Sequence, residues 1–317
     1  MSTASYNCPC CCGGPLKFSG ESGKLECTAC GNNYEPEALE MMTPEESIDE
    51  ITFANDAKRF DTGEAGMRAY FCKNCGAELM ADETAAAECP YCGSPTILPD
   101  RIEGGVKPEK VIPFVVTKEQ AQKQFEDYFK GKRLLPNIFL NGRNRISEMR
   151  RLYIPYWLFS CDACADMVYD AEKVHTKQKG EWEITRTKHY LVRRRGGMRF
   201  ENIPVDGSVK MDDKLTESLE PYDLSAAIPF QSAVLAGAMA DHADADCDAC
   251  EKRAVERSVE QTMLDTVRDY DTVSERSRRI IAERGSATPA LLPVWLMMTV
   301  KEGKTYTFAV NGQTGKL

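Results

Sequence analysis

The chain has 317 residues, of which 42% are hydrophobic and 28% charged, so it is long enough for about two domains with buried cores. Its net charge of −9 is concentrated at the front, where residues 1–66 hold 4 Lys/Arg against 12 Asp/Glu. This acidity disfavours binding of the phosphate backbone of a nucleic acid. The sequence also has no apolar run as long as the ~18–20 residues of a membrane-spanning helix.

Cysteine is the most informative residue type, with 14 copies. The first residues, MSTASYN, have neither the basic start nor the apolar run of a signal peptide. We therefore expect a cytoplasmic protein whose thiols stay reduced and bind metal. Twelve of the cysteines form six C-x-x-C pairs, a spacing that lets two thiolates reach one ion at ~2.3 Å.

The first two pairs predict a zinc ribbon over residues 1–37. Its expected ligands are Cys8, Cys11, Cys27 and Cys30. The stretch CPCCCGG leaves one alternative open, because Gly13 follows Cys12 and would suit a C-x-x-x-C pair. We favour Cys11 because Cys8-Pro9 matches the later Cys89-Pro90, and the two-residue spacing then selects it.

Residues 38–66 are predicted to form an acidic helical linker. Thr43 is a suitable helix cap, and Pro44 with two following glutamates is typical of a first turn. The helix is expected to continue to about Arg59.

A second zinc ribbon is predicted over residues 67–98. Its expected ligands are Cys72, Cys75, Cys89 and Cys92. Both ribbons share one layout, in which two cysteine knuckles flank a pair of short strands. A unit of about 30 residues buries too little apolar surface to fold alone, so metal binding would supply most of its stability. With four thiolates each, both sites are predicted to be structural.

Residues 99–317 are predicted to form an α+β domain. An amphipathic helix is expected to begin at Thr117, with Ala121, Phe125, Tyr128 and Phe129 on one side. A longer helix is expected from about Ala249 to Arg268. Strands are expected at residues 152–159, 165–175, 182–192, 197–203, 291–300 and 304–310.

Two short patterns recur within this domain. The stretch VIPF at residues 111–114 resembles AIPF at 227–230, and YIPYWL at 153–158 resembles LLPVWL at 291–296. They indicate two related halves, about 106–205 and 222–317. Chance similarity between apolar runs remains the alternative.

The tetrapeptide CDAC also occurs twice, with 82 residues between the two copies. We predict that these pairs share a third metal across the contact between the halves. The four proposed ligands are Cys161, Cys164, Cys247 and Cys250. The alternative is four free cysteines that pack as small hydrophobic residues.

No motif of an enzyme is present. The sequence lacks a phosphate-binding loop, a dinucleotide fingerprint, H-E-x-x-H and G-x-S-x-G, and it contains 3 histidines. We therefore expect no catalytic residues and no organic cofactor.

Several longer stretches resemble a known family. YFCKNCGAEL, YIPYWLFSCDA, FENIPVDGSVKMDD and the C-terminal LLPVWLMMTVKEGKTYTFAVNGQTGKL are similar to the bacterial TFIIB-type zinc-ribbon proteins, often labelled primosomal helicase-like. The resemblance covers essentially the whole chain. It implies a place beside SPFH-domain membrane scaffolds, with membrane contact only through a partner or a further C-terminal segment. No helicase motif accompanies it, so that activity is not implied.

We therefore expect a non-enzymatic zinc adaptor that docks partner proteins, at the cytoplasmic face of the membrane. Nucleic-acid binding through the ribbons is the alternative, with Arg150-Arg151 and Arg193-Arg194-Arg195 as the basic clusters. A thiol redox protein is the third reading. Iron in place of Zn2+ also remains open, since four-thiolate sites accept either metal.

Overall fold

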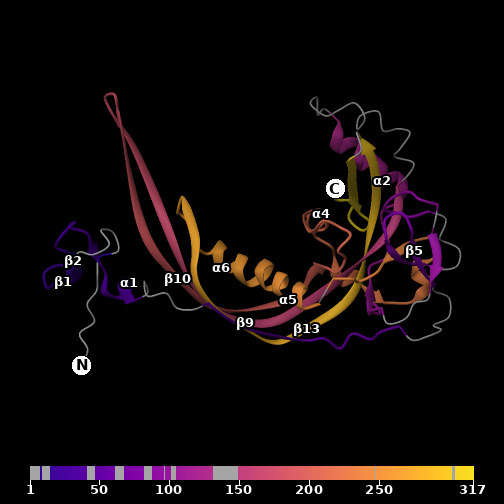
Figure 1. The fold of residues 1–317 in the computed structure, drawn as a ribbon, viewed down its shortest axis with the longest axis horizontal. Coiled ribbons are helices and arrows are strands. Elements are labelled where there is room, and N and C mark those ends of the chain that lie inside the picture. Colours follow the sequence, from indigo (N-terminus) through magenta and orange to yellow (C-terminus); the bar gives the residue numbers. More distant parts are fainter. Residues whose placement is uncertain are drawn as a thin grey trace. The chain divides into compact units, whose positions relative to one another are not determined.

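The computed structural model describes residues 8, 15–40, 47–60, 68–81, 88–95, 97–100, 105–130, 149–245, 247–301 and 304–317. The fold is mixed α+β, mostly sheet with few helices (Figure 1). Unit 1 comprises Met1–Ile51, Asp162–Met198 and Val259–Glu283. Unit 2 comprises Thr52–Cys161, Arg199–Ser258 and Arg284–Leu317. These units interleave along the chain, whereas the sequence predicts boundaries after residues 37, 66 and 98.

Unit 1 begins with a small antiparallel sheet of order β1-β2-β3. Its strands are β1 (Leu16–Ser19), β2 (Lys24–Cys27) and β3 (Asn33–Tyr34), and helix α1 (Pro36–Glu40) follows. Leu16 pairs with Cys27, and Leu25 pairs with Tyr34. This sheet matches the two strands and knuckle expected of a ribbon.

The remainder of unit 1 is formed by parts of three long strands and a helix. These strands are β9 (Arg150–Lys179), β10 (Trp182–Asp206) and β13 (Thr272–Lys301), and β9 pairs with both others. Met167, Tyr169 and Ile280 are buried here. The strands predicted at 152–159 and 165–175 are thus both parts of β9, and those predicted at 182–192 and 197–203 are both parts of β10.

Unit 2 is built on a large sheet of order β11-β8-β13-β9-β12-β6-β5-β7. The shorter strands are β5 (Arg68–Cys72), β6 (Glu78–Ala81), β7 (Ile97–Asp100), β8 (Lys110–Val111), β11 (Ile228–Pro229), β12 (Met239–Asp241) and β14 (Lys304–Asn311). β6 pairs antiparallel with β12, which pairs parallel with β9. The second ribbon is therefore continuous with the main sheet and is not a separate module.

The core of unit 2 explains the apolar runs around residues 152–159 and 290–297. Leu152, Ile154 and Tyr156 alternate into one cluster, whereas Tyr153 packs in another. Both faces of β9 are buried here, so its sequence reads as a continuous apolar run instead of an alternation.

The predicted helices are present with small differences. α2 (Lys118–Phe129) begins at a capping box formed by Thr117 and Gln120. Ala121 and Phe125 are buried as expected, but Tyr128 is 48% exposed; the Phe129 side chain lies outside the described residues. The further helical segments are α4 (Asp213–Ser218), α5 (Cys247–Val255), a π-helical turn (Glu256–Glu260), α6 (Gln261–Asp265) and 3-10 turns at Leu224–Ala226 and Ser232–Leu235.

The predicted linker helix is wrong where the structure describes it. Residues Ile48–Ala54 form strand β4, which pairs with β13, and the capping signals at 43–46 lie outside the described residues. The segment ITF has β-branched and aromatic residues that favour a strand. Phe53 packs edge-to-face on Phe159 at 5.1 Å between ring centroids, so tertiary packing decides the conformation.

The relation between the two predicted halves stays a prediction, and their elements can be compared in chain order. The first half contains β8, α2 and the β9–β10 hairpin. The second half contains β11, β12, α5, α6 and the β13–β14 hairpin. β8 pairs parallel with β13, and β12 pairs parallel with β9, so each half adds a short strand beside the long strand of the other. Across the described part of the chain, no helix has the length and apolar character needed to cross a bilayer.

Candidate metal centres

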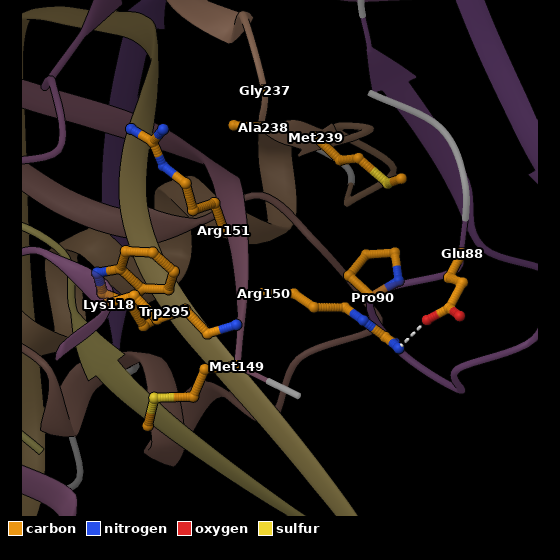
Figure 2. A pocket seen from close by; sticks show the side chains of 10 residues that line it. All are labelled: Glu88, Pro90, Lys118, Met149, Arg150, Arg151, Gly237, Ala238, Met239 and Trp295. Atoms are coloured by element: carbon orange, nitrogen blue, oxygen red, sulfur yellow. Dashed lines mark hydrogen bonds and ion pairs between the residues drawn. The ribbon is translucent and has the colours of Figure 1, made fainter. Parts of the chain in front are cut away.

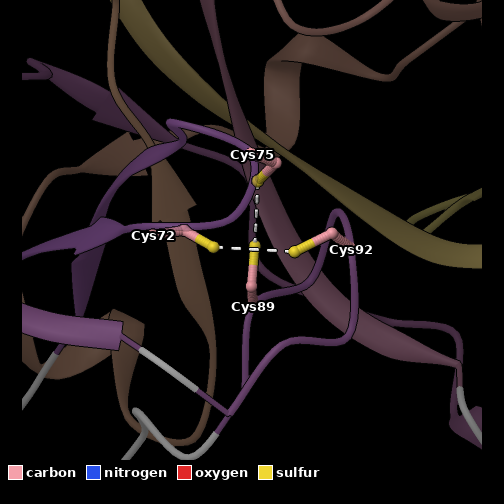
Figure 3. A group of neighbouring side chains, drawn as sticks. All are labelled: Cys72, Cys75, Cys89 and Cys92. Carbon is pink, nitrogen blue, oxygen red and sulfur yellow. Dashed lines mark hydrogen bonds between the residues drawn. The ribbon is translucent and has the colours of Figure 1, made fainter.

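The second ribbon brings its four predicted ligands together. Cys72, Cys75, Cys89 and Cys92 point toward one another, and all four Sγ atoms lie within 4.8 Å of each other (Figure 3). Cys72 and Cys92 Sγ are 3.5 Å apart, and Cys75 and Cys89 Sγ are 3.6 Å apart. A tetrahedral ion with bonds of ~2.3 Å separates its sulfur ligands by about 3.8 Å, so the cluster could hold one metal.

Each described knuckle has the same backbone hydrogen bond, from a glycine N–H back to the carbonyl of the first cysteine. The pairs are Gly31 to Cys27, Gly76 to Cys72 and Gly93 to Cys89, at 2.8–2.9 Å. These glycines have φ of 72°, 70° and 72°. That region is open to glycine but strained for other residues, which explains glycine after the cysteine pair.

Gly93→Ala is expected to destabilise the protein by about 1–2 kcal/mol through its positive φ. The added Cβ would meet only the Arg150 guanidinium, at an ordinary 3.7 Å, so backbone strain is the cause. Thermal unfolding should shift down by about 2–6 °C. Gly196→Ala is the control, since its φ is not positive and nothing lies within 4 Å of its added Cβ. Equal behaviour of the two variants would contradict this explanation.

The electrostatics of the second cluster favour a bound cation. Cys72 and Cys89 are 0% exposed, and burial raises the pKa of both Cys75 and Cys89. Burial also opposes ionisation of Cys92, but hydrogen bonds from Asn74 and the Ser94 backbone outweigh it and lower its pKa to about 7. Four thiolates at this depth need a compensating positive charge, which a divalent metal supplies.

Two cationic side chains hold the backbone around this cluster. Arg150 Nη1 donates to the Cys89 carbonyl at 2.7 Å, and Lys210 Nζ donates to the Cys75 carbonyl at 3.3 Å. Both place positive charge beside the thiolates. These two contacts are not predictable from the sequence, because Arg150 and Lys210 are far from the cysteines along the chain.

The first ribbon brings together the three predicted ligands that the structure describes. Cys8, Cys27 and Cys30 lie with their Sγ atoms within 4.8 Å of one another, and Cys8 Sγ is 3.6 Å from Cys30 Sγ. The Tyr34 hydroxyl lies 3.3 Å from Cys8 Sγ. Cys11, and its alternative Cys12, lie outside the described residues, so the fourth ligand stays a prediction.

The CDAC pairs do not form a third cluster of this kind. Among the described residues, groups of three or more candidate ligands within 4.8 Å occur at the two ribbons, and the CDAC cysteines are not among them. Cys161 and Cys164 lie on strand β9, where residues three apart face opposite sides; the first is buried and the second exposed. Cys247 and Cys250 lie on helix α5, and the Cys250 thiol donates to the Asp206 carbonyl at 3.4 Å. The predicted third metal site is therefore not formed in the described structure, because one CDAC lies on a strand and the other on a helix and neither forms a metal-binding turn.

Together these features define a mixed α+β protein with two cysteine clusters that could each hold a metal ion. No protein-family model and no solved structure matches the chain. It is 35% identical over 316 residues to "Uncharacterized protein YdjG" of Bacillus subtilis (strain 168), covering 99% of this chain and 88% of YdjG. The chain therefore belongs to the family of YdjG.

Proposed function

We propose that this protein is a non-enzymatic adaptor, stabilised by two structural Zn2+ ions, that docks partner proteins. Four thiolates complete the tetrahedral shell of zinc and leave no open position for a substrate. Continuity of the second cluster with the main sheet supports this structural role, because the metal then stabilises the strands that pair with β12 and β9.

The observation that carries the docking proposal is exposed apolar surface on the β9–β10 hairpin. Trp182 is 78% exposed and Ile184 is 52% exposed, and these two residues, two apart on β10, lie on one face of the hairpin. Large exposed apolar side chains that gather on one element are typical of interaction surfaces, and Trp is enriched among the residues that dominate binding energy.

The partner and location follow from the resemblance to the TFIIB-type zinc-ribbon proteins. We propose an SPFH-domain scaffold as the partner and the cytoplasmic face of the membrane as the site of action. Membrane contact then occurs through this partner, or through a further segment of the chain.

Capture of an SPFH-domain scaffold from membranes by the tagged full-length protein tests this function. Trp182→Ser with Ile184→Ser is expected to lower recovery of the scaffold by at least about tenfold, because a buried Trp anchor is typically worth ~2 kcal/mol or more. Val209→Ser is the control, since Val209 is 67% exposed but lies in unit 2. Failure to capture a scaffold, or equal capture by all variants, would overturn the proposal.

Nucleic-acid binding is the second candidate function, but through a surface other than the arginine clusters that the sequence indicates. Arg193 and Arg195 both pair with Asp166, at 2.7 and 2.8 Å, and Arg150 pairs with Glu88. These carboxylates compete with phosphate for the predicted basic clusters.

The β9–β10 hairpin, which also carries the exposed Ile184, offers a basic surface apart from these arginine clusters. A hollow of about 660 Å³ there is lined by basic side chains that include Lys177, Lys179, Arg186 and Lys188. A mobility shift of DNA at low salt that weakens as salt rises would favour nucleic-acid binding. Its absence at low salt would remove this candidate.

A further inference from the structure

Unit 2 has a hollow of about 370 Å³ beside the metal-binding knuckle at Cys89 (Figure 2). Its walls come from the start of α2, the starts of β9 and β12, strand β13, and residues Glu88 and Pro90. Neither the metal centres nor the docking surface uses this hollow.

The hollow is positively charged although the whole protein is acidic. Its ten lining residues include Lys118, Arg150 and Arg151 but a single carboxylate, Glu88. Arg150 is occupied by its ion pair with Glu88 and its hydrogen bond to the Cys89 carbonyl. Within the described residues, Arg151 has no carboxylate partner, and its buried Nε has no hydrogen-bond acceptor.

Arg151 is held in place by aromatic rings instead of by an acid. Its guanidinium lies 4.5 Å from the Phe114 ring centroid and 6.0 Å from that of Trp295. The Trp295 indole is fixed by its hydrogen bond to the Val116 carbonyl at 2.9 Å. Stacking of this kind leaves the planar N–H edge of a guanidinium open to an oxyanion, which it binds in bidentate geometry.

The other wall of the hollow is apolar. Met149, Met239 and Trp295 line it, and each side chain is almost completely buried. Methionine adapts to ligands of different shape, and an apolar wall with a few polar groups is typical of small-molecule sites.

We propose that this hollow binds a small organic anion, with its carboxylate or phosphate group on Arg151 and its apolar body against Met149, Met239 and Trp295. Lys118 adds a second positive charge at the first residue of α2. The Arg151 guanidinium, which lines the hollow and has no carboxylate partner in the described residues, is the charged group that such a ligand would pair with. This inference does not depend on the adaptor function.

Calorimetric titration of the metal-loaded full-length protein tests the site with phenyl phosphate, phenylacetate and neutral 2-phenylethanol. At least one anion is expected to bind at least about tenfold more tightly than the alcohol, which lacks the charge-assisted contact. The better anion identifies phosphate or carboxylate as the preferred group. Trp295 lines the hollow, so binding should also change tryptophan fluorescence.

Arg151→Met is expected to reduce anion affinity at least about tenfold, and Lys118→Gln to reduce it less. Lys123→Gln is the matched control, because Lys123 lies on the same helix and is exposed. If Arg151→Met fails to fold, Lys118→Gln still tests the charge dependence against this control. The proposal is overturned if no anion binds at about 10 mM, if the alcohol binds equally well, or if inorganic phosphate binds as tightly as the aryl anions.

Discussion

With a metal ion in each cysteine cluster, as proposed, Cys72→Ser is expected to remove one of the two ions and to unfold unit 2. Structural zinc contributes roughly 10–16 kcal/mol in small four-ligand sites, and a typical domain has a net stability of about 5–15 kcal/mol. Cys72 is fully buried at the end of β5, which pairs with β6 and through it with β12. Loss of this ligand therefore removes support from strands of the main sheet.

Two further variants separate this effect from loss of any cysteine. Cys164→Ser should keep both metal ions and the wild-type unfolding temperature, because Cys164 is exposed on β9 and belongs to neither cluster. Cys27→Ser should lose one metal ion but leave unit 2 folded, because its cluster lies in unit 1. Elemental analysis, native mass spectrometry and thermal unfolding measure these outcomes. A Cys72→Ser protein that loses metal but unfolds at the wild-type temperature would contradict a structural role.

Local chemistry made parts of the fold and the candidate site predictable. The cluster of Cys72, Cys75, Cys89 and Cys92 depends on two short knuckles whose geometry follows from their own sequence. The start of α2 was likewise predictable, since Thr117 and Gln120 satisfy each other's backbone groups within one turn.

Features that depend on distant strand pairing were not predictable. Ile48–Ala54 follows helix-start signals but forms a strand because β13 lies beside it. Cys161 and Cys164 have metal-ligand spacing, yet the continuous strand β9 turns them to opposite faces. Spacing alone does not reveal whether C-x-x-C forms a turn, a strand or a helix.

A buried pair of carboxylates is another feature that the sequence did not indicate. The Ser208 and Tyr91 hydroxyls both donate to Asp241 Oδ2 at 2.5 Å, and the Ser208 N–H donates to Asp206 Oδ1 at 2.9 Å. Asp206 Oδ2 is buried without a partner in the described residues. Burial is the main cause that raises the pKa of Asp206 to about 7 and the pKa of Asp241 to about 6. Repulsion from the Asp241 and Asp213 carboxylates adds to the shift of Asp206, and repulsion from Asp244 adds to that of Asp241.

These raised pKa values predict that unfolding free energy falls as pH rises from about 4 to about 7. In this window the folded state binds more protons than the unfolded state, whose Asp pKa is ~3.9, so stability decreases with increasing pH. For Asp206, the decrease between pH 5.5 and 8 is about 2 kcal/mol. Asp206→Asn is always neutral and keeps an acceptor for the Ser208 N–H, so it should remove this contribution.

Denaturant unfolding of the metal-saturated protein at pH 5.5, 7 and 8 measures the effect as the difference between wild type and variant. This difference cancels titration of the cysteines, which both proteins share. Asp206→Asn should gain stability relative to wild type as pH rises, whereas Asp56→Asn, at an exposed position, should keep the wild-type slope. A parallel dependence for wild type and Asp206→Asn would mean that Asp206 is ionised throughout this range. The carboxylate pair would then be held by hydrogen bonds that offset its burial.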